Sequence, residues 1–150
     1  MKRILVYILA AAAALAIPME SIDVGKLQPV GLVQVYKEKG NVIIMTDTGD
    51  IGEGDQVASA FEDLEKTTTG VVFLDTADYL LLSVDAADLL RDLSAYLKPG
   101  VKVCLADSGI DLVKAAEYLK VHRPPVKLGG CEGVQNLPKL EQENGRLKLK

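Results

Sequence analysis

Short apolar runs separated by stretches with helical spacing constrain this chain more than any other feature of its sequence. Val71–Leu74 and Tyr79–Leu82 are continuous apolar runs, and Val101–Ala106 is a third, largely apolar one. Runs of this kind are typical of strands that are covered on both faces of a sheet. Because segments with helical periodicity lie between and after them, the order strand–helix–strand predicts an α/β domain with a partly parallel sheet.

Three helices are predicted from apolar residues that recur every three or four positions along the chain. We expect them at residues 56–66, 85–97 and 108–121. The expected N-caps are Asp55, Asp85 and Ser108, because short polar side chains accept the unpaired amides of a first turn. Ser108 is followed three residues later by Asp111, a spacing that resembles a capping box.

Two β-hairpins complete the predicted fold. The first joins residues 31–37 to residues 42–46 through a turn that contains Gly40, and the second joins residues 139–143 to residues 146–150 through Asn144-Gly145. The prediction is an α/β fold, with α+β as the alternative: a mixed sheet, three helices and a C-terminal hairpin. With 150 residues, the chain is expected to hold one domain, at 31–150, after a linker at 19–30.

The N-terminus has the pattern of a targeting segment. Lys2 and Arg3 precede an unbroken apolar run from Ile4 to Ile17, which is shorter than the roughly 20 residues of a transmembrane helix. Ala14-Leu15-Ala16 offers a cleavage site for signal peptidase. Residues 1–18 are therefore predicted to be a signal peptide or an uncleaved membrane anchor, which places the protein outside the cytoplasm, secreted or tethered.

Composition argues against a nucleic-acid partner. The formal net charge is −4, aromatic residues make up 5% of the chain, and the basic residues form no concentrated patch. Such a surface neither attracts a phosphate backbone nor offers rings on which bases stack. The two cysteines, Cys104 and Cys131, could pair in an oxidising compartment, but spacing alone does not decide between a disulfide and two free thiols.

An acidic stretch suggests two kinds of chemistry. Asp47-Thr48-Gly49 follows an apolar strand and resembles the active-site turn of aspartic proteases over those three residues, although Asp50 stands where that family has a small residue. Four carboxylates of this stretch could instead hold calcium, which takes several oxygen ligands. They are Asp47, Asp50, Glu53 and Asp55. The simpler interpretation is a polar loop that closes a hairpin.

Two further motifs are incomplete. Val71–Asp75 resembles the first motif of haloacid-dehalogenase-type phosphatases, but Ala77 occupies the place of the acid/base aspartate. Asp107-Ser108-Gly109 stands where a strand meets a helix, a place where anions bind in parallel sheets. The one histidine, His122, lies at the far end of the predicted helix that Ser108 begins, too far away to activate that hydroxyl. No catalytic residue and no cofactor is predicted.

The order of elements from Leu32 to Leu119 resembles the N-terminal domain of Ger(x)C-type proteins, the C subunits of spore germinant receptors. The similarity rests on the first hairpin with Gly40, the segments Phe61–Leu64 and Leu89–Leu93, and the strand Val101–Ala106. It implies an exported, non-enzymatic partner of a membrane complex, associated with sporulation or germination. The lipidated cysteine and the further domains of that family are missing, and no functional residue is carried over.

Three hypotheses follow from these patterns. In the first, an exported module without enzymatic activity docks on another protein of the cell envelope, with the C-terminal hairpin as a candidate edge for strand addition. In the second, the protein is a small hydrolase that uses Asp47 or Asp75, which requires two carboxylates in close reach. In the third, the acidic stretch is a calcium-binding surface loop.

Overall fold

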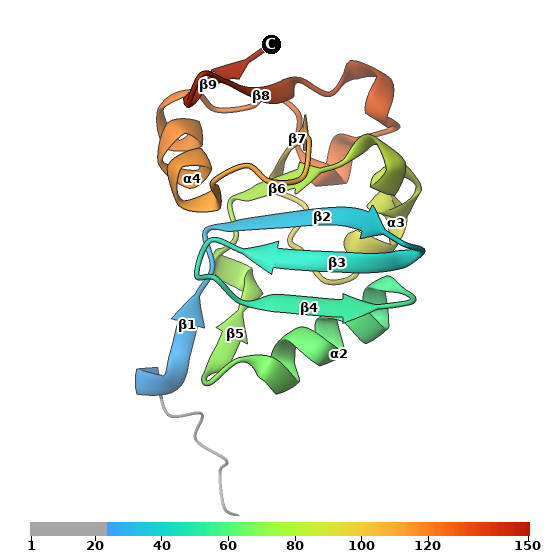
Figure 1. Ribbon diagram of the computed structural model, residues 1–150, viewed down its shortest axis with the longest axis vertical. Coiled ribbons are helices and arrows are strands. Elements are labelled where there is room, and N and C mark those ends of the chain that lie inside the picture. The colour runs from blue at the N-terminus through green and yellow to red at the C-terminus, as the bar shows by residue number, and fades with distance from the viewer. Residues whose placement is uncertain (1–23) are drawn as a thin grey trace, which may run out of the picture.

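The centre of the structure is a mixed sheet of seven strands in the order β4-β3-β2-β6-β7-β8-β9 (Figure 1). This computed structural model describes residues 24–150. The four middle strands are parallel: β2 (Leu32–Glu38), β6 (Tyr79–Leu82), β7 (Lys102–Ala106) and β8 (Lys139–Glu143). Antiparallel strands flank them: β3 (Asn41–Thr46), β4 (Ile51–Gly54) and β9 (Arg146–Leu149). The predicted mixed sheet, its helices and the C-terminal hairpin are confirmed.

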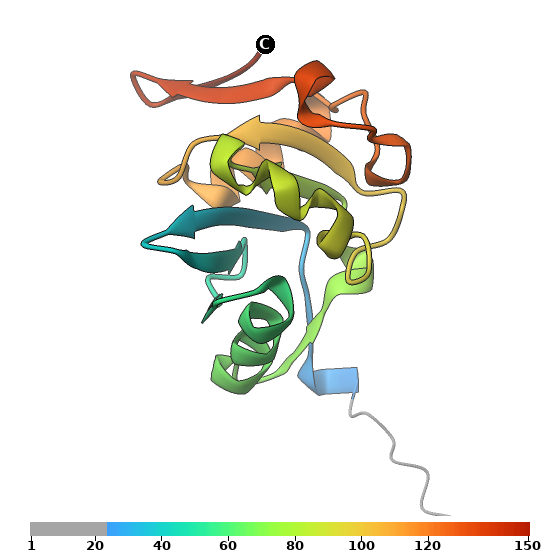
Figure 2. The same ribbon diagram turned by 90° about the vertical axis from the view of Figure 1, so that its right-hand side faces the viewer.

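Hydrophobic cores cover both faces of this sheet. Leu80 and Leu82 of β6 point into the first core, beneath α2 (Val57–Thr67), the 3-10 helix η3 (Val84–Leu89) and α3 (Leu90–Leu93). Tyr79 and Leu81 point into the second core, beneath α4 (Leu112–Val121). Figure 2 shows η3 and α3 in front of the strands and α4 behind them. Continuous burial of β6 is the reason why its sequence is apolar at every position.

The helix boundaries differ from the predicted ones at the caps. Gln56, one residue after Asp55, is the N-cap of α2, and the carboxylate of Asp55 accepts the Ser59 hydroxyl at 2.7 Å. The helix expected from Ser108 starts at Leu112, because the side chain of Asp111 accepts the Lys114 amide at 3.2 Å. Residues expected to form one helix from Asp85 instead make η3 followed by the single turn α3.

Two segments predicted as linker or loop contain strands. Within the expected linker at 19–30, β1 (Leu27–Pro29) follows the 3-10 turn η1 (Val24–Lys26) and pairs in parallel with β5 (Val71–Phe73). In the acidic stretch, β4 pairs with β3. These strands are too short for an alternation of apolar and polar residues to distinguish them from a loop. In β4, two of the four residues are also glycines, which weaken a strand pattern further.

The remaining segments are short 3-10 turns. The turn η2 (Leu74–Thr76) leads into β6, and η4 (Leu128–Gly130) and η5 (Val134–Asn136) precede β8. Leu128 and Leu137 anchor this last stretch in the first core. Among residues 24–150, no helix combines the length and the apolar character needed to cross a bilayer. The predicted signal or anchor segment, residues 1–18, lies outside the residues described.

Helix α2 closes the edge of the sheet at β4 (Figure 1). The Glu53 amide donates to the Asp63 carboxylate at 3.0 Å, and the Thr67 hydroxyl donates to the Ile51 carbonyl at 3.1 Å. Gly52 allows this close approach, because a Cβ there would lie 2.2 Å from the Ala60 carbonyl oxygen of α2. This edge therefore presents side chains of a helix in place of free backbone groups.

We expect Gly52→Ala to destabilise the fold by about 1–3 kcal/mol, because the added methyl group overpacks against backbone that has no room to move. Gly130→Ala is the matched control, since a Cβ at Gly130 meets nothing within 4 Å, and its effect should stay within about 0.5 kcal/mol. Urea denaturation followed by circular dichroism measures both. Equal stabilities of the two variants would contradict the close packing of α2 on β4.

Candidate functional site

The four carboxylates proposed as calcium ligands engage four different neighbours. Those of Asp47, Asp50 and Glu53 accept hydrogen bonds from the Gly31 backbone amide at 3.1 Å, from the Thr48 hydroxyl at 2.7 Å and from the Asn41 side-chain amide at 2.6 Å. Asp55 is engaged with Ser59, as described above. In the part of the chain that the structure describes, no three His, Cys, Asp or Glu side chains come together as metal ligands. These contacts do not favour the calcium hypothesis.

The two aspartates of the hydrolase hypothesis stand in separate local structures. Asp47 holds the entry to β2 through the Gly31 amide. Asp75 lies in η2, where the neighbouring Thr76 hydroxyl donates to backbone carbonyls and accepts the Val30 amide at 3.0 Å. No hydrogen bond joins the two carboxylates within residues 24–150. The bond from the Gly31 amide gives Asp47 a structural role at the entry to β2, and it is Thr76, next to Asp75, that fixes the backbone at Val30.

Ser108 and His122 also remain apart. His122 follows the last residue of α4 and stacks on Tyr118, with ring centroids 4.3 Å apart. Ser108 lies before the first turn of the same helix, at the carboxyl end of β7. The structure thus agrees with the expectation that the imidazole does not reach this hydroxyl.

The two cysteines lie on opposite faces of the sheet and are both free thiols. Cys104 is fully buried in the second core beneath α4, and burial raises the pKa of its thiol to about 12. Cys131 packs against the first core, and its thiol donates to the Gly133 carbonyl at 3.4 Å. Because the sheet separates them, pairing would require one thiol to leave its core.

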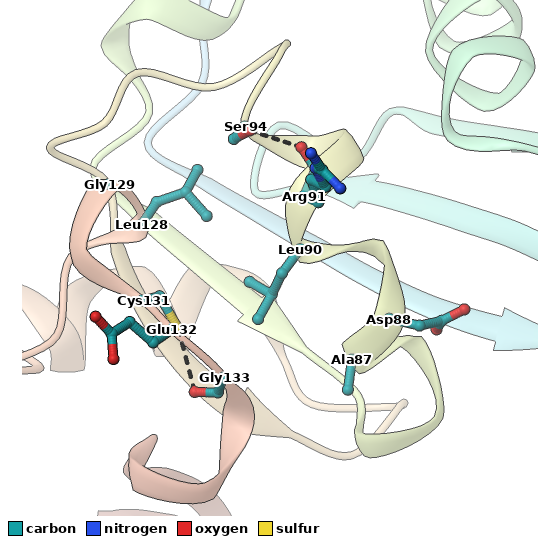
Figure 3. A pocket seen from close by; sticks show the side chains of 10 residues that line it. All are labelled: Ala87, Asp88, Leu90, Arg91, Ser94, Leu128, Gly129, Cys131, Glu132 and Gly133. Carbon is teal, nitrogen blue, oxygen red and sulfur yellow. Dashed lines mark hydrogen bonds between the residues drawn. The ribbon is translucent and has the colours of Figure 1, made fainter.

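The groove beside Cys131 has a volume of about 460 Å³ and lies between α3 and the turn η4 (Figure 3). Leu90 and Leu128 form its apolar part. Two of its polar side chains are engaged elsewhere: Asp88 pairs with Lys37 at 2.7 Å, and the Ser94 hydroxyl donates to the Arg91 carbonyl. Figure 3 shows the two other charged side chains, Arg91 and Glu132, on opposite sides of the groove, so its charged groups do not converge.

A second opening lies at the carboxyl ends of the parallel strands. A cavity of about 420 Å³ reaches from Tyr36 of β2 past Ser83, the residue after β6, to Asp107 after β7. The sequence motifs point to Asp107 and Ser108 but not to Ser83. Ser83 could have been predicted from its position, because it is a polar residue directly after the apolar run Tyr79–Leu82. The carboxyl ends of parallel strands are where polar groups from neighbouring strands meet.

The C-terminal hairpin forms the open edge of the sheet. Asn144 and Gly145 have φ values of 51° and 76°, as the predicted type I′ turn requires. Lys139 and Lys150 exchange both backbone hydrogen bonds at 2.9 Å. Because this pairing alternates along antiparallel strands, Leu147 and Leu149 direct their N–H and C=O groups away from β8.

Only part of this edge is closed. The Leu149 amide donates to the Tyr118 hydroxyl of α4 at 3.2 Å. The amide of Leu147 has no acceptor among the described residues, and no further strand pairs with β9. The sequence predicts this hairpin but not the role of Tyr118, because its position on the helix predicts packing in the core and not a hydrogen bond to a strand edge. The two edges of the sheet thus differ, since α2 covers one and a single tyrosine touches the other.

The charged residues of β9 are all basic. Arg146 and Lys148 are exposed and lie opposite Glu143 and Glu141 of β8. Lys150 forms ion pairs with both glutamates, and its hydrogen bond lowers the pKa of Glu141. The outer strand therefore presents a basic row beside an acidic one, with half-buried Leu147 and Leu149 on the other face of the sheet.

We expect the two thiols to react very differently. In the native protein, iodoacetamide should label Cys131 and leave Cys104 unmodified, because Cys104 is buried and its thiol remains protonated near neutral pH. In urea both should react. Peptide mass spectrometry measures the two sites separately, with Cys131→Ser as the control. Native labelling of both cysteines, or a disulfide between them, would contradict their placement in opposite cores.

Comparison of the chain with protein-family models, with curated proteins and with solved structures found no match. The function is therefore inferred from the geometry of the described residues. Its strongest feature for recognition of another macromolecule is the free edge at β9.

Proposed function

We propose that this protein is an exported interaction module without enzymatic activity that binds an extended segment of a partner protein along β9. The observation that carries the proposal is the difference between the two edges of the sheet. Helix α2 supplies Asp63 and Thr67 to the backbone of β4, whereas the outward amide of Leu147 has no acceptor among the described residues. An added strand would satisfy such backbone groups.

Charge on the edge favours a foreign segment over a second copy of the chain. Two β9 strands side by side would bring the basic residues of both copies, Arg146 and Lys148, close together, and like charges across strands are destabilising. A segment with acidic residues at alternate positions would instead place carboxylates beside these basic residues, as β8 does with Glu141 and Glu143. Apolar residues between them would extend the surface of Leu147 and Leu149.

The N-terminal sequence supports a location outside the cytoplasm for this interaction. The apolar run Ile4–Ile17 behind Lys2 and Arg3 has the pattern of an export signal. The resemblance to Ger(x)C-type proteins suggests a partner within a membrane complex of the cell envelope, in sporulation or germination. Gene neighbourhood is a direct check of that process, because sporulation genes beside this one would favour it and a metabolic operon would not.

Leu147→Pro should strongly weaken strand addition while the sheet itself is retained. The substitution removes an outward amide, and proline is tolerated on an edge strand where its missing N–H faces solvent. The probe is a fluorescent peptide of alternating leucine and glutamate, with binding measured by anisotropy on the full chain. We expect binding to weaken by more than about tenfold in Leu147→Pro, since main-chain bonds supply the affinity of an added strand.

Leu147→Ala is the matched control, because it shortens the same side chain and keeps the amide. This variant should bind the acidic peptide nearly as well as the natural chain does. A peptide of alternating leucine and lysine should bind neither the natural chain nor the alanine variant. Equal binding of the acidic peptide by the proline and alanine variants would overturn the proposed edge, as would preference for the basic peptide.

Export should depend on the N-terminal apolar run. We expect the chain outside the cytoplasm, where protease added to spheroplasts degrades it, and deletion of residues 4–17 should leave it protected inside. N-terminal sequencing then distinguishes the two forms that the pattern allows, since signal-peptidase cleavage after Ala16 gives a chain that begins at Ile17 and an anchor leaves the chain intact. A full-length chain that is soluble in the cytoplasm would contradict the export prediction.

A further inference from the structure

A second, smaller sheet projects from the end of the molecule where the described chain begins. It is a two-stranded parallel ribbon of β1 and β5, with Leu27 beside Val71 and Pro29 beside Phe73. Figures 1 and 2 both show this ribbon at the opposite end of the molecule from β9. The ribbon is therefore separate from the strand edge described above.

One face of the ribbon is apolar throughout and belongs to neither core. Val72 packs against the first core, and because side chains alternate along a strand, Val71 and Phe73 point away from it. Their register partners, Leu27 and Pro29, share their face. Val71 is 44% exposed and Phe73 is 36% exposed, while Pro29 is exposed and Leu27 is half-buried.

Charge does not give this face a preference for ions of either sign. Along the chain, the nearest charged residues are Lys26, directly before β1, and Asp75, two residues after β5. Both are exposed, and their charges are opposite. A face of this composition favours an apolar partner.

The sequence before the ribbon indicates which apolar partner this is. Only residues 18–23 separate the apolar run Ile4–Ile17 from Val24, where the described chain starts, and a segment of that length spans at most about 20 Å. An anchor in the bilayer therefore keeps the ribbon close to the lipid surface. The run is also shorter than the roughly 20 residues of a transmembrane helix, and the mismatch of a short span draws the adjoining chain toward the headgroups.

We propose that the apolar face of the ribbon, formed by Leu27, Pro29, Val71 and Phe73, rests on the lipid surface beside an uncleaved N-terminal anchor. Four side chains expose far less than the roughly 800 Å² per partner of a stable protein interface, which argues against a second copy or a partner protein on this face. A tethered face needs no such area, because the anchor holds it near the bilayer at a high effective concentration. In turn, the added apolar contact strengthens a weak anchor. The inference rests on the anchored form of the export proposal and is independent of the β9 edge.

The test makes use of a sequence without tryptophan. Val71→Trp introduces a single one on the ribbon, and the matched control Val113→Trp replaces another exposed valine on α4, which lies away from the ribbon (Figure 1). The full chain of each variant is reconstituted into phosphatidylcholine vesicles and isolated by flotation. We expect the emission of Val71→Trp to shift to shorter wavelengths, and to lose intensity when the upper acyl chains of the lipid are brominated. The emission of Val113→Trp should do neither.

A second substitution separates lipid contact from anchoring. Phe73→Glu, added to Val71→Trp, puts a carboxylate into the apolar face. It should abolish both effects on the emission, while the chain still floats with the vesicles and keeps its circular dichroism spectrum.

The possible failures are distinguishable. Cleavage after Ala16 in cells, or a full chain that does not float with the vesicles, would overturn the inference through loss of the anchor and would leave the β9 edge untouched. Flotation without quenching of Val71→Trp would overturn the lipid contact alone, and a wavelength shift without quenching would assign the face to residues 1–23 or to a second copy. Equal quenching of Val113→Trp, or quenching that survives Phe73→Glu, would also overturn the contact.

Discussion

The structure depends on the complete burial of β6. Its four residues, Tyr79–Leu82, have parallel neighbours on both sides and a hydrophobic core on each face. A strand in this position contributes apolar area in both directions, and each fully buried leucine stabilises the fold by about 1.5–3 kcal/mol through removal from water. Helices must lie on both faces for this burial to occur, so the layered arrangement follows from one short run of sequence.

Two-sided coverage also explains where open space remains. A chain that must cover both faces leaves adjacent strands in opposite directions, and here this happens after β6 and after β7. The ends of these strands cannot be packed by the same helices that cover their faces. Polar residues and loop amides collect at that edge, with Gln34 tying the Asp107 loop to β2. The open crevice at the carboxyl ends of these strands is therefore a consequence of the same topology that buries β6.

An open sheet has two edge strands, and the outward backbone groups of these strands need partners. At β4, two glycines let α2 approach closely enough for Asp63 and Thr67 to bond the strand backbone. At β9, Tyr118 makes one such bond, and among residues 24–150 no further strand pairs with this edge. Basic residues along β9 discourage pairing with a second copy, a common protection of free edges, and in the proposed function the same residues favour an acidic partner segment.

Strong local signals were enough for much of this fold. Continuous apolar runs identified β6 and β7, helical spacing identified α2 and α4, and Asn144-Gly145 identified the last hairpin together with its turn type. These features depend on residues near one another in the chain, which is why the sequence by itself determined them. The weak strands β1 and β4 were missed, because three or four residues carry little periodicity and their pairing energy comes from distant partners.

Placement in space was decided only by the tertiary structure. The sequence left open whether Cys104 and Cys131 pair, and the sheet that lies between their two cores keeps them apart. Four carboxylates close together in the chain point to four different partners, whereas Tyr36, Ser83 and Asp107, far apart in the chain, line one cavity. The physical reason is that strand order sets which residues meet, and strand order depends on long-range burial that no local pattern encodes.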